Sequence, residues 1–452
     1  MTAAPAQPVP APASPGDRPL RVAAALVAVG LAVAAFLLRD VINDRLQAFF
    51  GIICFVGIIA ACSTNLRAVN WRTVAWGMAL QLGLALLILK VEIAGTRPGY
   101  AAFTWVGNVV KQFLEFTNAG STFVFGPLAD QTAMNRVFGN GFVFAFTALP
   151  TIIFVASFFT VLYYFGVLQF IVRMFARAMM YLMRTSGAET LSAVANVFMG
   201  QTEAPIIVKP YVPMMTQSEL LALMVGGMAT ISGGVMAVYI SLGADPVAIL
   251  TTSVMAAPCG LYLAKILFPE QDEPVTRGEV RVQVERAHTN VIDAAAAGAS
   301  DGMTLALNVA AMLIAFLAFI ALFDYVLGRL HEGLSLARVF GFVFAPVAVL
   351  MGVPRADVPE VADLLGTKLV ANEFVAYVKL TGEYRDISPR AYTLATFALT
   401  GFANFASIGI QLGGIGGMAP SRRGDLARLG SRALLGGFIA TLINASLAAI
   451  LM

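Results

Sequence analysis

Long apolar runs recur along the chain, and short polar segments separate them. Runs of about twenty residues are long enough for an α-helix to cross the hydrocarbon core of a bilayer. Because lipid offers no partners to backbone polar groups, such runs form helices whose hydrogen bonds are internal. The predicted spans are 22–38, 48–64, 73–91, 141–170, 217–242, 246–267, 300–328, 389–414 and 433–451. The pattern predicts an all-α, polytopic membrane protein.

Two long segments, near 178–214 and 336–380, are neither clean spans nor clean loops. Lys and Arg gather at the cytoplasmic ends of membrane helices, and this rule orients the predicted spans. The basic residues that mark those ends are Arg67, Arg72, Arg173, Arg177, Arg184, Lys265, Arg277, Arg281, Arg422, Arg423, Arg428 and Arg432. They fit one topology only if each ambiguous segment enters and leaves on the same face. Both segments are therefore predicted to be re-entrant hairpins.

A weak internal repeat supports this interpretation. The stretch VANV at 194–197 lies in the first predicted hairpin and VANE at 370–373 in the second, and each precedes a glycine-rich span. An odd number of crossings between them would give the halves 141–268 and 300–452 opposite orientations. Inverted repeats with interrupted helices are typical of secondary transporters, whose binding site lies near the membrane midplane.

The other segments carry simpler expectations. Residues 1–20 are rich in Ala and Pro and are predicted to be a disordered tail. Residues 21–140 are predicted to be scaffold spans, with an extra span at 22–38 in place of a signal peptide. Within this region 101–118 is amphipathic, which fits an interfacial helix and, equally, a helix packed on a neighbouring subunit. Residues 269–299 are predicted to be a cytoplasmic linker between the halves.

Composition agrees with a membrane protein and excludes several function classes. Hydrophobic residues make up 59% of the chain and charged residues 12%, whereas soluble domains carry about 25% charged residues. A net charge of +3 is too small to indicate a nucleic-acid partner. The sequence has no GxxxxGK[ST] motif for ATP and no Cys or His pair at metal-ligand spacing.

Three polar residues in a row, Gln201, Thr202 and Glu203, interrupt the first hairpin between Gly200 and Pro205. A charged side chain at membrane depth costs at least about 2.5 kcal/mol, so such residues are retained for a function. The flanking Gly and Pro indicate a broken helix that faces a cavity. The alternative is a helix-capping box at the hairpin tip, which does not exclude ligand binding.

Glu373 interrupts the second hairpin in the stretch VANEFVAY. A structural alternative is an ion pair with Lys368 or Lys379, but they lie five and six residues away. Side chains on a helix meet at spacings of three or four, so helical geometry favours neither pair. Glu373 is therefore predicted to be a second polar group of the binding site.

Asn404 and Ser407 are three residues apart, so on a helix they share one face, with Phe402 nearby. Single polar residues in membrane helices often only join helices, but this set adds an aromatic ring. Amides, hydroxyls and carboxylates can form hydrogen bonds with the hydroxyl groups of a sugar and with the donors and acceptors on the edge of a planar base. No Arg lies in these motifs, which argues against phosphate. The set predicts a nucleoside-like or sugar-like solute, and not a nucleotide.

A separate set of oxygens fits a small hard cation such as sodium. Asn196 and Thr230 can supply side-chain oxygens, and backbone carbonyls near the helix breaks can add to them. Broken helix ends leave such carbonyls unpaired, and transporters coordinate sodium in this way. Asn196 can equally serve only to join the two arms of the hairpin.

The sequence resembles the concentrative nucleoside transporter family from about residue 47 to its end. The motifs that carry the resemblance are GQTEAP at 200–205, MAAPCGLYLAK at 255–265, GVP at 352–354, NEFVAY at 372–377, GFANFASIGIQLGGIG at 401–416 and APSRRGDLARLG at 419–430. Several of these motifs are long and specific. The resemblance implies a homotrimer in the bacterial inner membrane, in which a mobile transport domain moves like an elevator against a scaffold.

The resemblance also implies roles for individual residues. The nucleobase of a uridine-like nucleoside would be read by Gln201, Thr202 and Glu203, beside Phe402. The ribose would be held by Glu373, Asn404 and Ser407. Sodium would be bound by Asn196, Met199, Thr230 and Ile231. The shape of the cavity around Val235 and Phe402 would decide between purine and pyrimidine nucleosides.

Two departures and three rival functions accompany this prediction. The span at 22–38 precedes the core of bacterial members and would place the N-terminus in the cytoplasm. Thr230 stands where sodium-coupled members have Ser, which keeps the hydroxyl but adds a methyl group.

Some bacterial relatives use protons, so proton symport is the main alternative, although Asn196 favours sodium. A passive channel is less consistent, because it would not need the inverted hairpins. An intramembrane enzyme is less consistent, because the sequence lacks an HExxH motif and a histidine cluster.

Overall fold

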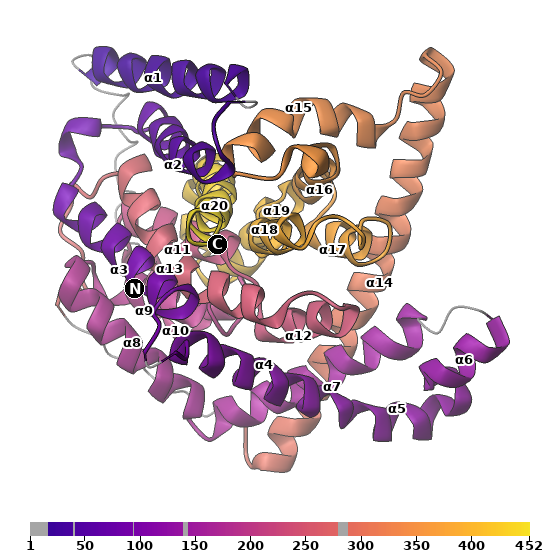
Figure 1. The fold of residues 1–452 in the computed structure, drawn as a ribbon. Coiled ribbons are helices and arrows are strands. Elements are labelled where there is room, and N and C mark those ends of the chain that lie inside the picture. Colours follow the sequence, from indigo (N-terminus) through magenta and orange to yellow (C-terminus); the bar gives the residue numbers. More distant parts are fainter. Residues whose placement is uncertain (1–16, 39–40, 94, 139–142, 279–287) are drawn as a thin grey trace.

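A computed structural model describes residues 17–38, 41–93, 95–138, 143–278 and 288–452 of the chain (Figure 1). Within these ranges the fold is almost entirely helical, with one isolated β-bridge between Ile93 and Thr96. The helices are α1 (Arg18–Leu37), α2 (Asp44–Ala61), α3 (Trp71–Leu89), α4 (Pro98–Glu115), α5 (Thr117–Phe125), α6 (Gln131–Phe138), α7 (Phe144–Tyr164), α8 (Val167–Met183), α9 (Gly187–Ala195), α10 (Ala204–Ile207), α11 (Gln217–Ala229), α12 (Gly233–Leu242), α13 (Pro246–Leu267), α14 (Val291–Leu330), α15 (Leu336–Leu350), α16 (Val358–Val370), α17 (Glu373–Thr381), α18 (Pro389–Leu399), α19 (Phe405–Met418) and α20 (Arg423–Leu451).

Eight helical segments in the described part of the chain are long and apolar enough to cross a membrane. They are α1, α2, α3, α7, the pair α11 and α12, α13, α14 and α20. Eight of the nine predicted spans correspond to these segments. The ninth, 389–414, consists of two shorter helices, α18 and α19, with a break at residues 400–404. The span at 217–242 is broken in the same way at 230–232.

The broken helices lie at the centre of the molecule. Helices α11, α13 and α20 are mostly buried and pack on one another, whereas α1, α7 and α14 are mostly exposed (Figure 1). The large apolar side chains of those outer helices, such as Leu26, Phe319 and Phe323, face outward. An apolar exterior around a polar-containing interior is what a lipid environment requires.

The two predicted hairpins coincide with pairs of short helices. In the first, α9 and α10 pack together and the polar tip at 200–203 lies between them. In the second, α16 and α17 pack together around the tip at 371–372, and α15 precedes them. That these pairs enter and leave a membrane on one face stays a prediction, as do the domain boundaries.

The first hairpin is anchored by a buried polar network at its base. Ser186 and Thr216 begin α9 and α11 with reciprocal capping boxes. The Ser186 hydroxyl also donates to Oε1 of Glu219 at 2.5 Å, which ties one cap to the other. Lys265 on α13 lies 2.7 Å from Oε2 of Glu189. These bonds hold α9, α11 and α13 together as one body.

Three boundaries differ from the prediction. Helix α14 begins at Val291, inside the predicted linker 269–299, because Asn290 caps it and an alanine-rich stretch follows. Helix α1 begins at Arg18, inside the predicted tail, of which residues 1–16 lie outside the described ranges. The predicted amphipathic helix at 101–118 is α4, which ends at Glu115 and packs on α3 and α13.

Helices α7 and α14 pack closely through two glycines spaced as GxxxG. A Cβ atom on Gly302 would lie 2.8 Å from Cα of Ile153 and 2.9 Å from Cβ of Ala156. A Cβ on Gly298 would lie 2.5 Å from Oγ1 of Thr160. Small residues at this spacing let membrane helices approach at backbone distance.

We expect Gly302→Val to lower the stability of the protein by about 1–3 kcal/mol, because the added carbons collide with the α7 backbone. Gly328→Val on the same helix is the matched control, since nothing lies within 4 Å of a Cβ placed there. Thermal unfolding in detergent measures the difference. Equal melting temperatures for the two variants would contradict this account of the contact.

Candidate functional site

A cavity of about 160 Å³ lies where the first hairpin tip meets the two broken helices. Side chains from the tip, α12, α14, α17 and α19 line it. It contains every residue predicted to contact the nucleoside, namely Gln201, Thr202, Glu203, Val235, Glu373, Phe402, Asn404 and Ser407. The fold thus brings together residues more than 200 positions apart, although their individual roles stay predictions.

Glu373 is the first residue of α17 and is almost fully buried. Its Oε1 accepts a hydrogen bond from the Tyr239 hydroxyl at 3.1 Å, and its Oε2 accepts one from Nδ2 of Asn404 at 2.9 Å. The alternative ion pairs are not formed: Lys379 binds Asp363, and Lys368 donates to neutral oxygens. The carboxylate is held by neutral donors that a polyhydroxylated ligand can replace or extend.

Asn404 and Ser407 contact each other, but they do not share the predicted helical face, because Asn404 lies just before the helix. Asn404 is the N-cap of α19, and its Oδ1 accepts from the backbone N–H of Ser407 at 2.9 Å. A helix that begins after a break needs such a cap, because its first N–H groups have no partner within the helix. The amide nitrogen of Asn404 is thereby directed to Glu373, and the Ser407 hydroxyl to Gln201.

Gln201 is positioned by two residues of α19. Its Nε2 donates to Oγ of Ser407 at 3.1 Å, and its Oε1 accepts from Nε2 of Gln411 at 3.2 Å. Gln411 also donates to the carbonyl of Met224 at 3.0 Å. Sequence reasoning missed Gln411 and Tyr239; for Gln411 the spacing of four from Ser407 was an available signal.

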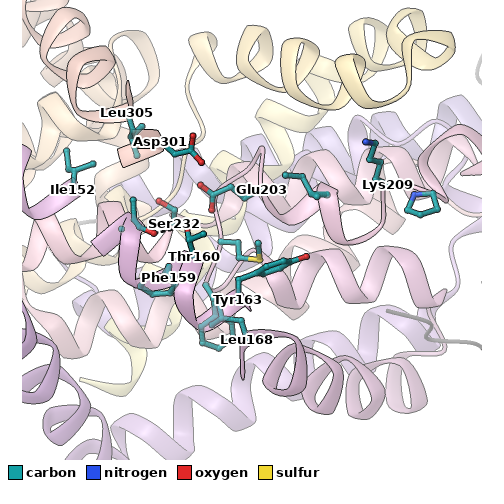
Figure 2. Close-up of a pocket in the computed structure, with 16 residues that line it drawn as sticks. Ile152, Phe159, Thr160, Tyr163, Leu168, Glu203, Lys209, Ser232, Asp301 and Leu305 are labelled. Atoms are coloured by element: carbon teal, nitrogen blue, oxygen red, sulfur yellow. Dashed lines mark hydrogen bonds between the residues drawn. The ribbon is translucent and has the colours of Figure 1, made fainter. Parts of the chain in front are cut away.

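Glu203 faces two cavities. Its Oε2 accepts from the backbone N–H of Gly200 at 3.1 Å, which is half of the predicted capping interaction, while its side chain stays exposed. The second cavity, of about 330 Å³, shares Glu203, Ser232 and Leu305 with the first. Figure 2 shows the carboxylates of Asp301, on α14, and Glu203 beside each other, with the ring of Tyr163 below them. The two cavities thus adjoin at Glu203.

The predicted sodium ligands gather around the end of α11. Asn196 is fully buried; its Nδ2 donates to the Ser192 carbonyl at 2.9 Å, and its Oδ1 has no hydrogen-bond partner among the described atoms. The same Nδ2 lies 3.3 Å from the position that a Cβ on Gly226 would take. Thr230 donates its hydroxyl to the Gly226 carbonyl at 2.9 Å.

The donor set around Asn196 fits a hard monovalent cation. An unpaired buried amide oxygen is costly, and a cation is one partner that satisfies it. The carbonyls of Met199 and Ile231 lie in the non-helical stretches that follow α9 and divide α11 from α12. Across the described ranges, no group of three or more His, Cys, Asp and Glu side chains is placed to hold a metal. The predicted ligands of the ion are an amide oxygen, a hydroxyl and two backbone carbonyls, which are all neutral oxygens.

The two sites touch through one backbone hydrogen bond. The N–H of Phe402, in the second break, donates to the carbonyl of Thr230, in the first break, at 3.1 Å. Gly401 makes this approach possible: its φ is +157°, and a Cβ there would lie 3.0 Å from the Met228 carbonyl oxygen. The predicted aromatic wall of the substrate cavity is thus bonded to a predicted sodium ligand.

Comparison with known proteins agrees with this geometry. Residues 50–128 and 248–449 match the Na⁺-dependent nucleoside transporter N-terminus and C-terminus families, and residues 145–246 match a nucleoside recognition (gate) family. A transporter of Haemophilus influenzae with no assigned function is 42% identical, over 89% of this chain and 97% of its own. The chain belongs to the sodium-dependent nucleoside transporter family.

Members of this family with named activities and solved structures are also similar. Sodium/nucleoside cotransporter 1 of Mus musculus is 42% identical over 94% of this chain and 67% of its own. CNTnw in an inward-facing, substrate-bound state superposes with a TM-score of 0.84 at 38% identity, over 90% of this chain and 98% of that one. An outward-facing CNTnw variant superposes with a TM-score of 0.86. The predicted family and all-α polytopic fold are confirmed, and the relatives are transporters, not enzymes.

Gly227 on α11 leaves room for the hydrogen-bonded pair of glutamines in this family member. A Cβ on it would lie 2.8 Å from Nε2 of Gln411 and 2.9 Å from Cβ of Gln201. We expect Gly227→Ala to displace the Gln201 amide and to weaken nucleoside binding about tenfold, or ~1.4 kcal/mol.

Gly413→Ala is the matched control, because nothing lies within 4 Å of a Cβ at that position on α19. Binding of uridine to the purified protein, measured by calorimetry, compares the two variants. Unchanged affinity in Gly227→Ala would mean that the Gln201 amide does not contact the ligand.

Proposed function

We propose that this chain is a secondary active transporter that imports nucleosides by symport with sodium, through alternating access. The observation that carries the proposal is the placement of both ligand sets at the crossing of two broken helices. Interrupted helices at such a crossing are where secondary transporters bind substrate and ion. The curated relatives are sodium/nucleoside cotransporters, and the related CNTnw structures include inward-facing and outward-facing states.

The cavity suits a neutral nucleoside. The Gln201 amide offers a donor and an acceptor in the plane of a base, and the Phe402 ring offers a face against it. Glu373 and Asn404 lie together and can accept from and donate to the ribose hydroxyls, and Ser407 adds a hydroxyl. No Lys or Arg lines this cavity in the described structure, so a phosphate would be left without a counter-charge. Uridine is the proposed test substrate.

Sodium is the proposed coupling ion and is a co-substrate of the transport cycle. Asn196, Thr230 and the carbonyls of Met199 and Ile231 are the proposed ligands. Binding of the ion would order the Thr230 carbonyl, which already holds the Phe402 backbone. Ion and nucleoside binding are then linked, since each stabilises the same arrangement of the two breaks.

The arrangement of buried and exposed helices suggests which parts move. We infer a transport body containing both hairpins and both broken helices, and a scaffold that includes the outer helices α1, α2, α3, α7 and α14. The proposed sequence units are 21–140, 141–268 and 300–452. A homotrimer, a bacterial inner-membrane location and a cytoplasmic N-terminus complete the proposal.

Uptake of labelled uridine into proteoliposomes tests the function. Three conditions are compared: an inward sodium gradient, an inward proton gradient, and no gradient. Accumulation driven by sodium is the expected result. Accumulation driven only by protons would keep the nucleoside and replace the ion. Equilibration without accumulation under every gradient would indicate a passive channel. Glu373→Gln, which converts an acceptor-only group into a mixed one, is the expected inactive control.

We expect Asn196→Ala to raise the sodium concentration for half-maximal uptake about tenfold or more, because a buried ligand oxygen is removed. Uridine affinity at saturating sodium should change much less. The measurement is initial uptake rate against sodium concentration. Sodium dependence equal to that of the unmodified protein would place the ion elsewhere.

A further inference from the structure

Lys368 is a buried cation that neither proposed site uses. It lies in the last turn of α16, and none of its surface is exposed. Its Nζ donates to the carbonyl of Ala398 at 2.6 Å and to Oγ1 of Thr441 at 3.0 Å. The ammonium also lies 5.5 Å from the centre of the Phe438 ring. None of the ion pairs found among the described residues includes Lys368.

Glu373 attracts this ammonium through its charge but forms no ion pair with it. Because burying an ammonium is costly, the groups in contact with it must compensate the rest of the cost. Ala398 lies in the last turn of α18, where carbonyls lack helical partners and the helix dipole is negative. The helical partner of this carbonyl would be the N–H of Phe402, which donates instead to Thr230. The crossing of the two breaks therefore creates the acceptor that Lys368 occupies.

The first repeat has a related arrangement, in which the proposed sodium ligand Asn196 aligns with Asn372, one turn after Lys368. Aligning VAN at 194–196 with VAN at 370–372 places Ser192 at the position of Lys368. In the first repeat, α9 brings the unpaired Oδ1 of Asn196 to the end of α11. In the second repeat, α16 brings an ammonium to the end of α18. One broken helix thus meets neutral oxygens, and the other meets a charged donor.

We propose that the Lys368 ammonium is a tethered cation, which takes in the second repeat the place that sodium takes in the first. Each subunit then binds one exchangeable cation, and removal of the amine opens a second cation site. The inference rests on the proposed sodium site of the first repeat.

The three groups around the Lys368 ammonium would also attract a small monovalent cation, so they do more than cap a helix. A carbonyl, a hydroxyl and an aromatic face all attract a cation. A neutral donor such as an amide would cap Ala398 at a smaller desolvation cost. A permanent charge at this place is explained if the end of α18 needs a cation in every state of the transport cycle. The ion of the first repeat, by contrast, must bind and dissociate in each cycle.

The test counts sodium ions bound to the purified full-length protein by equilibrium binding of radioactive sodium. Three proteins are compared: the unmodified chain, Lys368→Ser, which introduces the residue found at position 192, and Lys368→Met, which fills the space without charge or oxygen. We expect about one ion per chain for the unmodified protein and Lys368→Met, and about two for Lys368→Ser. The Hill coefficient for sodium in uridine uptake should rise above 1 only in Lys368→Ser, since it is limited by the number of sites.

A count of one ion in folded Lys368→Ser overturns the inference, because a purely structural lysine would change stability and not the number of ions. If Lys368→Ser does not fold, Lys368→Asn replaces it, and a count of one overturns the inference equally. An unmodified protein that binds no sodium would instead refute the proposed ion coupling. The double variant Asn196→Ala with Lys368→Ser should keep one ion, at the new site.

Discussion

Two interrupted helices meet in the middle of this protein, and one backbone hydrogen bond, from Phe402 N–H to the Thr230 carbonyl, joins their breaks. Backbone groups released by a helix break are costly at membrane depth unless they find new partners. Here each break supplies a partner for the other. The same bond sets the Phe402 ring against the substrate cavity and holds Thr230 at the end of α11. The positions of both proposed sites follow from this crossing.

Glycines decide how closely the elements around the crossing approach. Gly401 adopts a positive φ that suits glycine, and any side chain on it would meet the carbonyls at the end of α11 as well as Thr441, 2.7 Å away. Gly414 leaves space for the methyl group of Thr202, which would lie 2.8 Å from a Cβ there. The polar side chains of the site are thus brought together by the absence of side chains on the facing helices. The positions of these polar side chains are therefore set by close contact between backbones and not by long flexible side chains.

The sequence predicted those features whose free-energy cost in a membrane restricts which residues can occur. Apolar run length predicted the spans, and polar residues at membrane depth predicted six residues that line one cavity, Glu373 among them. The other two predicted lining residues are apolar: Phe402 was chosen for its aromatic ring, and Val235 followed from the family resemblance. Tyr239 was missed because it lies in an apolar helix, and one sequence does not show which turn faces the cavity. Gln411 was missed although its spacing of four from Ser407 was an available signal. Asn404 was placed on a helix face although it is a cap, because the break before α19 is decided by contact with α11. Asp301, which lines the adjoining cavity, was missed because only the fold brings α14 close to Glu203.

The distribution of charge around the crossing gives a reason for symport. The inferred transport body carries Glu203 and Glu373 close to the cavity and Lys368 at the neighbouring helix end. With these groups ionised, the site holds one negative charge in excess before an ion binds. A bound sodium ion removes that excess, and a neutral nucleoside leaves it unchanged. Because moving a net charge through low dielectric is costly, the loaded body crosses the membrane more easily than the body with nucleoside alone. If sodium binds at the proposed neutral ligands, charge compensation thus accounts for the need for the ion when a nucleoside crosses.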